Sequence, residues 1–263
     1  MKSLSGCLAL FRKELTIYFT TPIFYLTGFF FTLLVGYLFY TNVLYYSLIS
    51  IQAVQQAAQD PQVAAQLNPQ QMVFRPMWGT LAIVLLFLVP LLTMRLFAEE
   101  KRAGTAELLF TYPLTDWAVI GGKFAAAFLV YSVLVGLTLG HGVSFALISR
   151  VEWAPLVTGY LGLILLGSAC LALGVFASSL TENQIIAGVA GFGLLLLFWT
   201  IGWLQEVWSG GTGGVFKYLS MLEHYENFTL GVIDTRDLVY YLGFTYFFLF
   251  LTKRQLESRR WRA

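Results

Sequence analysis

Residues 95–113 read RLFAEEKRAGTAELLFTYP, a charged stretch that lies between two long apolar runs. The runs on its two sides cover about residues 78–97 and 117–148. Each reaches or exceeds the roughly 20 apolar residues that an α-helix needs to cross a hydrocarbon core about 30 Å thick. The stretch therefore marks the place where a membrane-embedded chain meets water.

The composition of the whole chain agrees with this interpretation. Of 263 residues, 58% are hydrophobic and only 11% are charged, and the mean hydropathy is +0.72. An ordinary soluble domain carries roughly 25% charged residues. We therefore predict an all-α, polytopic membrane protein that lies in the lipid bilayer, and exclude a soluble globular fold.

The apolar runs predict six transmembrane helices in a single domain that covers residues 1–263. They extend over about residues 23–46, 78–97, 117–148, 156–180, 185–203 and 238–251. Pro90 is expected to kink the second helix. The last run holds only 14 residues, too few for a full crossing. We expect residues 205–237 to form short outer, re-entrant helices that complete this last crossing.

Residues 1–21 form an amphipathic stretch before the first run, in which apolar side chains recur at helical spacing and basic side chains occupy the opposite face. Its central residues are Phe11, Arg12, Lys13 and Glu14. Such a helix lies in the membrane interface, and Pro22 separates it from the first span because proline is not tolerated in a helix interior. A basic flank that only orients the first span would need the same residues, so both interpretations remain.

A polar, glutamine-rich segment, residues 47–76, separates the first two spans. It contains eight glutamines with alanines between them, and its only charged residues are Asp60 and Arg75. Alanine and glutamine favour helix, so we expect one or two short helices, broken at Pro61 and Pro69. On the outer side this segment would be either a docking surface for an extracytoplasmic accessory protein or a solvated connector.

The placement of basic residues predicts the orientation of the chain. With six spans, both termini and the stretch 98–115 share one side of the membrane. Of the 16 basic residues, 12 lie on that side, including the basic tail 252–263. The other four are Arg75, Arg150, Lys217 and Arg236. Because short cytoplasmic loops carry the excess of Lys and Arg, we predict cytoplasmic termini and a cytoplasmic stretch 98–115.

Residue patterns that carry chemistry are missing from the sequence. We find no metal-ligand cluster and no phosphate-binding glycine loop, and the predicted spans contain no Asp or Glu. His141 and His224 are interpreted as hydrogen-bonded or water-facing groups, and Cys7 and Cys170 as small apolar residues. We therefore expect that the chain is not an enzyme by itself, holds no cofactor or metal, and binds no nucleic acid.

The cytoplasmic stretch has the pattern of a helix, a turn and a second short helix. Mixed charges, including Glu99 and Glu100, extend the second span to about Arg102. Gly104 can end that helix because glycine accepts a positive φ. Thr105 is a candidate N-cap for the next helix, and Glu107 in its first turn is favoured by the helix dipole.

The second short helix carries apolar side chains that would face water. Leu108, Leu109, Phe110 and Tyr112 follow one another closely, and Pro113 ends the helix. Exposed apolar residues usually mark an interface. The alternative is a reversal that lies on the membrane with these side chains among the lipid headgroups. From the residues alone the two interpretations have equal weight.

Several segments together resemble a known family. They are residues 11–15, the stretch from Arg95 to Pro113, residues 122–123, residues 224–237 and residues 256–261. On these segments the chain resembles the permease subunits of type-2 ABC exporters, and is most similar to the branch of gliding-motility and copper-enzyme-maturation permeases. The segments are spread over the whole chain, whereas the glutamine-rich stretch is not part of the resemblance.

The resemblance implies an exporter subunit in a bacterial inner membrane. It implies that residues 98–115 form a coupling helix seated in a groove of a separate ABC ATPase, which binds ATP and Mg²⁺. It also implies a dimer, made either with a second copy or with a related chain. Within the coupling segment the implied ATPase contacts are Leu108, Leu109 and Tyr112, the electrostatic positioning residues are Glu99, Glu100 and Glu107, the hinge is Gly104, and Thr105 and Pro113 bound the helix.

Two other functions remain open at this point. A subunit that transports nothing could transmit ATP-driven motion to an extracytoplasmic partner through its outer loops. An intramembrane enzyme is the other alternative, and the missing catalytic pairs argue against it.

Overall fold

The computed structural model describes residues 2–56, 68–105, 114–149, 152–204 and 213–260. Within these ranges every regular element is a helix and no strand occurs, which confirms the predicted all-α class. The helices are α1 (Lys2–Thr20), α2 (Pro22–Gln56), the π-helix η1 (Gln70–Phe74), α4 (Arg75–Thr93), α5 (Arg95–Arg102), α7 (Asp116–Ile148), α8 (Trp153–Leu180), α9 (Gln184–Thr200), the 3₁₀-helix η2 (Ile201–Trp203), α11 (Gly213–Leu219), α12 (Met221–Thr229) and α13 (Thr235–Arg260).

Five stretches of helix are long and apolar enough to cross a membrane. They are Phe24–Gln55, Gln70–Arg102, Asp116–Ile148, Trp153–Leu180 and Gln184–Trp203. These correspond to the first five predicted spans. The sixth predicted span, residues 238–251, lies within the 26-residue helix α13. Its full crossing of the membrane stays a prediction.

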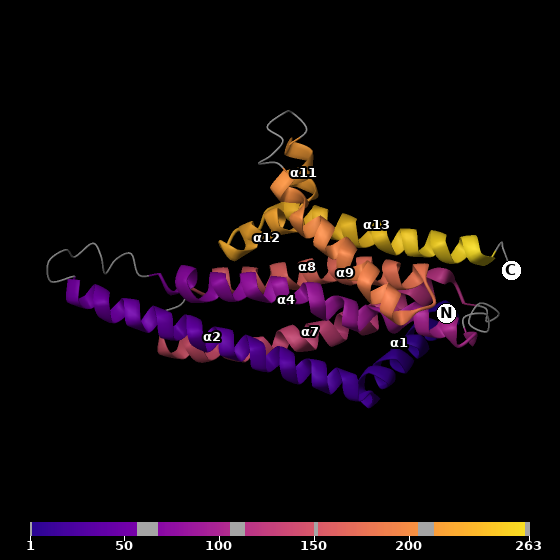
Figure 1. The fold of residues 1–263 in the computed structure, drawn as a ribbon, viewed down its shortest axis with the longest axis horizontal. Coiled ribbons are helices and arrows are strands. Elements are labelled where there is room, and N and C mark those ends of the chain that lie inside the picture. Colours follow the sequence, from indigo (N-terminus) through magenta and orange to yellow (C-terminus); the bar gives the residue numbers. More distant parts are fainter. Residues whose placement is uncertain (1, 57–67, 106–113, 150–151, 205–212, 261–263) are drawn as a thin grey trace.

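Helix α8 is the centre of the bundle. It packs against α4, α7, α9, α12 and α13, and Figure 1 shows it between these helices. Glycines on α8 allow the close approach: a side chain at Gly167 would overlap Tyr131 of α7, and one at Gly174 would overlap Thr93 of α4. Small residues at such contacts are typical of helices that associate in membranes.

Helix α2 lies at the edge of the bundle and is longer than the predicted span. It continues to Gln56, ten residues beyond the expected end at Tyr46. The first part of the predicted polar segment 47–76 is therefore helical, in keeping with its alanines and glutamines. Pro69 is the N-cap of η1, whereas Pro61 lies outside the described residues. Most of α2 presents apolar side chains to the surroundings, as a lipid-facing helix does.

The long helix of the second span is interrupted near its C-terminal end. Pro90 lies inside α4, and the helix breaks at Met94, one turn later. The Met94 N–H still donates to the Pro90 carbonyl oxygen over 2.8 Å. After this break α5 carries the charged residues of the second span.

Candidate functional site

The turn after α5 has the local geometry that the sequence predicts for Gly104, and α7 begins at a capping threonine. Gly104 follows α5 with a φ of 69°, a value that glycine adopts without strain. Thr115 caps α7, and its hydroxyl oxygen accepts a hydrogen bond from the Ala118 N–H over 3.3 Å. Thr105 donates its hydroxyl to the Glu100 carbonyl oxygen at 3.2 Å, so its described contact is with the end of α5.

The predicted ATPase-contact residues lie between these two ends. Glu107, Leu108, Leu109, Tyr112 and Pro113 are outside the described residues. Their roles, and the role of Gly104 as a hinge, stay predictions.

A buried lysine on α7 joins α5 to α1 and α7. Lys123 is 0% exposed. Its ammonium group lies 2.6 Å from a Glu14 carboxylate oxygen on α1 and 3.0 Å from a Glu100 carboxylate oxygen on α5. It also donates to the Leu96 carbonyl oxygen over 2.7 Å. A buried ammonium group is tolerated only with such partners, because it has lost its hydration.

A second lysine completes this group of charges, which we call the charge cluster: Lys13, Glu14, Glu100 and Lys123. The Lys13 ammonium lies 2.8 Å from a Glu100 oxygen. The positive charges of the two lysines therefore balance the negative charges of the two glutamates. The cluster ties together α1, α5 and α7, which are far apart in the sequence.

Lys13, the more exposed of the two lysines in the charge cluster, has a raised pKa. Partial burial alone would lower the pKa of Lys13, but the hydrogen bond and the negative charge of Glu100 outweigh it and raise the pKa above its ordinary value. The stabilisation from this raised pKa is present at neutral pH, and it is lost only as the pH rises through the raised pKa that Lys13 has in the folded protein.

Helix α1 packs against α7 with a buried stripe of side chains. Leu10, Glu14 and Tyr18 form a buried stripe at helical spacing, while Arg12 and Lys13 are exposed. A Cβ atom at Gly122 of α7 would lie 2.9 Å from the Cys7 carbonyl oxygen. The missing side chain at Gly122 thus lets α1 approach the α7 backbone closely enough for Glu14 to reach Lys123.

The end of α8 holds the other side of α5. The Ser178 hydroxyl oxygen accepts hydrogen bonds from the N–H groups of Phe97 and Ala98 over 3.1 and 3.2 Å. The same hydroxyl donates to the Met94 carbonyl oxygen at 3.0 Å. Ser178 therefore satisfies backbone groups at the break between α4 and α5, as an N-cap residue would. Lys101 also donates to the Ser179 carbonyl oxygen.

Parts of this site were predicted and parts were not. Glu14 and Glu100 were singled out in the sequence, and Lys123 belongs to the resembling segment 122–123, but no partner was predicted for Lys123. A signal was present, since a lysine within the apolar run 117–148 is costly unless it is paired. Ser178 gave no comparable signal, because serine is common at helix ends.

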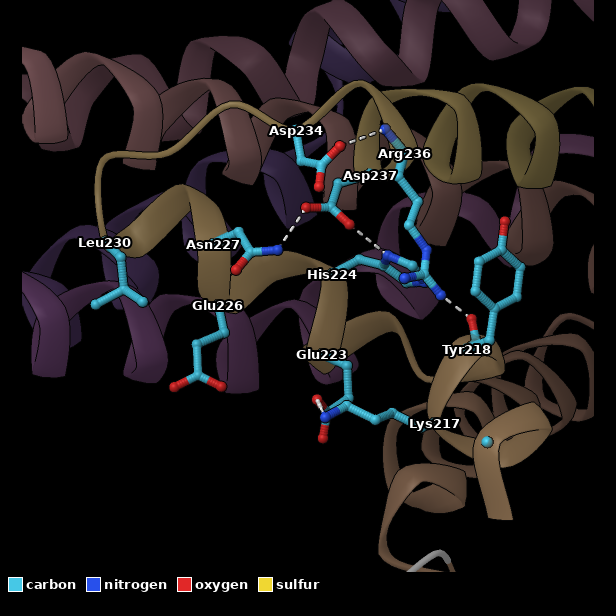
Figure 2. Close-up of a pocket in the computed structure, with 11 residues that line it drawn as sticks. Lys217, Tyr218, Glu223, His224, Glu226, Asn227, Leu230, Asp234, Arg236 and Asp237 are labelled. Carbon is cyan, nitrogen blue, oxygen red and sulfur yellow. Dashed lines mark hydrogen bonds and ion pairs between the residues drawn. The ribbon is translucent and has the colours of Figure 1, made fainter. Parts of the chain in front are cut away.

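A second polar site lies at the other face of the bundle, where α11, α12 and the start of α13 enclose a pocket of about 580 Å³ (Figure 2). His224 and Asp237 are its buried members. His224 Nδ1 lies 2.6 Å from an Asp237 carboxylate oxygen, and Nε2 lies 2.9 Å from the Tyr218 carbonyl oxygen. Both ring nitrogens therefore face oxygen atoms that can accept hydrogen bonds.

This pair fastens α12 to α13. The Asn227 side-chain amide donates to the second Asp237 oxygen over 2.8 Å. The His224 ring stacks on Tyr240 of α13 with the ring centroids 3.9 Å apart. His224 is thus hydrogen-bonded, one of the two predicted states, whereas its pairing with Asp237 was not predicted from the sequence.

We expect Asp237→Asn to lower the free energy of unfolding by about 1–2 kcal/mol. The carboxylate accepts hydrogen bonds through both of its oxygens, whereas the new NH₂ group would face the Asn227 amide donor. Thermal unfolding of the purified protein in detergent measures this. Glu223→Gln is the matched control, since the Glu223 side chain is 38% exposed where it meets Lys217. Equal melting temperatures for the two variants would contradict a structural role for the buried pair.

A family model described as "ABC-2 family transporter protein" matches residues 8–252, which include the charge cluster and the pocket at His224 and Asp237. No curated protein matches the chain.

Proposed function

The chain belongs to the ABC-2 family of transporter proteins and is thus a multi-pass membrane component of an ABC system, and we propose that it is the permease subunit of an exporter driven by a separate ATPase chain. In this proposal two permease copies, or one copy and a related chain, form the translocation path. The ATPase binds ATP and Mg²⁺ and docks on the cytoplasmic segment 98–115. The more specific resemblance to gliding-motility and copper-enzyme-maturation permeases stays a prediction.

The observation that carries the proposal is the pairing of Lys123 with both Glu14 and Glu100. Glu100 lies on α5, within the segment 98–115 on which the ATPase would dock. A displacement of that segment therefore acts on α7 through Lys123 and on α1 through Lys13 and Glu14. It also acts on α8, because Ser178 binds the backbone at the start of α5.

The proposed cycle follows from these connections. ATP binding brings two ATPase subunits together and moves the two coupling segments. The ion-paired ends of α1, α5 and α7 then move as one unit, because separating buried charges from their partners is costly. The spans at the seam between the two permeases shift from an inward-open to an outward-open arrangement.

The placement of the chain ends supports the proposed orientation. Figure 1 shows the N- and C-terminal ends at the same end of the bundle, close to α1. The predicted excess of basic residues belongs to this end. We therefore propose that it faces the cytoplasm of a bacterial cell, where an ATPase has access to ATP.

Replacing Leu108 and Leu109 by Asp tests the docking surface. We expect the double variant to reach the membrane but to lose the ATPase in a pull-down, because two charges replace the apolar contacts at the interface. Ala106→Asp is the control, since it adds a charge to the same segment at a residue outside the implied ATPase contacts Leu108, Leu109 and Tyr112. If the double variant retains the ATPase, the docking assignment is wrong. Mass spectrometry of proteins that copurify with the wild-type chain identifies the ATPase and any accessory protein.

A further inference from the structure

A smaller pocket of about 190 Å³ lies where α1, the first turns of α2, the break between α4 and α5, and the start of α9 meet. It is separate from both the charge cluster and the pocket at His224 and Asp237. Arg95 and Glu99 of α5 are its charged lining residues, and neither belongs to the charge cluster.

Arg95 is held in a fixed orientation with part of its hydrogen-bonding capacity unused. Its Nη1 donates to the Thr21 hydroxyl over 3.2 Å. The guanidinium carbon lies 4.4 Å from the centroid of the Tyr18 ring. Nη2 is buried and has no hydrogen-bond partner among the residues that the structure describes. A buried cationic donor of this kind costs free energy unless an acceptor reaches it.

The walls of the pocket contain both polar and apolar side chains. The polar residues include Arg95, Glu99 and Gln184, and the apolar residues include Phe24 and Leu91. Leu91, Arg95 and Glu99 follow one another at four-residue spacing, so the apolar Leu91 lies one turn before Arg95 on the same side of the helix. Leu91 is 45% exposed. The pocket also lies beside Pro22, where α2 begins and the chain enters its first predicted span. A ligand with a polar head and an apolar body matches this arrangement.

The charges of Arg95 and Glu99 limit which polar headgroups the pocket can bind. Arg95 and Glu99 are four residues apart on α5 and so lie on one face of the helix, with Cβ atoms about 5–6 Å apart. A guanidinium group binds a phosphate through paired N–H donors. A carboxylate beside it would repel a purely anionic head but would attract an amine. The pair therefore complements a head that carries a phosphate and an ammonium group.

We propose that this pocket binds the phosphate–amine headgroup of an inner-leaflet phospholipid, with the phosphate at Arg95 and the amine at Glu99. The volume fits a headgroup but not acyl chains, which lie against the apolar surface beyond Leu91. Glu99 then binds lipid, in contrast to its predicted role of positioning the ATPase. The inference depends on the membrane placement of the chain and not on the exporter assignment.

Native mass spectrometry of the full-length permease in detergent tests the proposal. Delipidated protein is titrated separately with phosphatidylethanolamine, phosphatidylglycerol and diacylglycerol. We expect the ethanolamine lipid to bind most tightly and diacylglycerol, which lacks the phosphate, to bind least. Diacylglycerol that binds as well as phosphatidylethanolamine would overturn the assignment. Displacement of the lipid by inorganic phosphate alone would show a site for free anions and would also overturn it.

Variants separate the roles of the two charges. Arg95→Gln should weaken phosphatidylethanolamine binding roughly 10- to 100-fold, because charge-assisted hydrogen bonds to the phosphate are lost. Arg102→Gln is the matched control, since Arg102 is an exposed arginine of the same helix. Glu99→Gln should reduce the preference for phosphatidylethanolamine over phosphatidylglycerol. Equal lipid binding by the Arg95 and Arg102 variants would refute the proposal.

A folding control and a further variant support this test. The size-exclusion profile of each variant shows whether it is intact. Gln184→Leu replaces a polar lining residue of the pocket without removing a charge. We expect the Gln184 variant to bind the lipid more weakly than wild type and more tightly than the Arg95 variant. Binding is measured on the permease alone, so failure of the exporter proposal would leave this result unchanged.

Discussion

Lys123→Met is expected to lower the free energy of unfolding by about 3–5 kcal/mol, the cost of removing one partner from a buried ion pair. Most of this cost arises because Glu14, which is 4% exposed and forms its ion pair with Lys123, would lose that partner. Glu100 keeps its contact with Lys13. Thermal unfolding in detergent, followed by the loss of the monodisperse peak in size-exclusion chromatography, measures the effect.

Two control variants make this result specific. Glu14→Gln combined with Lys123→Met removes both charges, and it should be more stable than the Lys123 variant alone because no buried carboxylate is left unpaired. Lys217→Met removes an exposed lysine whose side chain is 54% exposed, and it should change the melting temperature little. A Lys123 variant as stable as the Lys217 variant would contradict the importance of the cluster.

The second large effect is expected for Gly122→Leu. A Cβ atom at this position would lie 2.9 Å from the Cys7 carbonyl oxygen and 3.1 Å from the Leu10 Cβ atom. Backbone atoms of α1 cannot move aside as the end of a side chain can. We expect a loss of about 3 kcal/mol, the upper range for overpacking. The displaced α1 would also carry Lys13 and Glu14 away from their partners, so stimulation of the ATPase should fall.

The neighbouring glycine provides the control. A Cβ atom at Gly121 would have no neighbour within 4 Å. Gly121→Leu makes the same chemical change in the same helix, and leucine gains the same helix propensity over glycine at both positions. The difference between the two variants therefore measures the contact between α1 and α7. If both have the same melting temperature and ATPase stimulation, that contact does not position α1.

Both predictions concern contacts that would transmit motion from the ATPase. The charge cluster and the Gly122 contact hold α1 on α7, and Ser178 holds α5 on α8. An intact, membrane-inserted Lys123 variant that binds the ATPase without stimulating it would indicate that docking and transmission are separate functions. The Leu108 and Leu109 substitutions should instead remove docking itself.

Local patterns in the sequence were sufficient to predict most of the helices. A backbone inside a hydrocarbon core must satisfy its own hydrogen bonds, so a long apolar run there forms a helix. The third span was predicted at residues 117–148 and is Asp116–Ile148 in the structure. The helix end at Gly104 was also predictable, because it depends on the φ of a single residue.

Helix ends that depend on packing were less predictable. The run 238–251 was too short to identify the whole of α13, which continues to Arg260 because its polar residues extend a helix already packed on α8. Helix α2 likewise continues to Gln56, since alanine and glutamine allow helix even where the composition is that of a polar loop.

The sequence by itself determined an all-helical membrane chain, its helical periods, its local caps and a family resemblance that residues 8–252 bear out. Only the tertiary structure decided which charges meet. Glu14 and Lys123 are 109 residues apart, and His224 and Asp237 lie on different helices. Local sequence specifies the face of a helix on which a charge lies, but its partner is set by which helices pack together and at what register. That packing arises from contacts along the whole bundle.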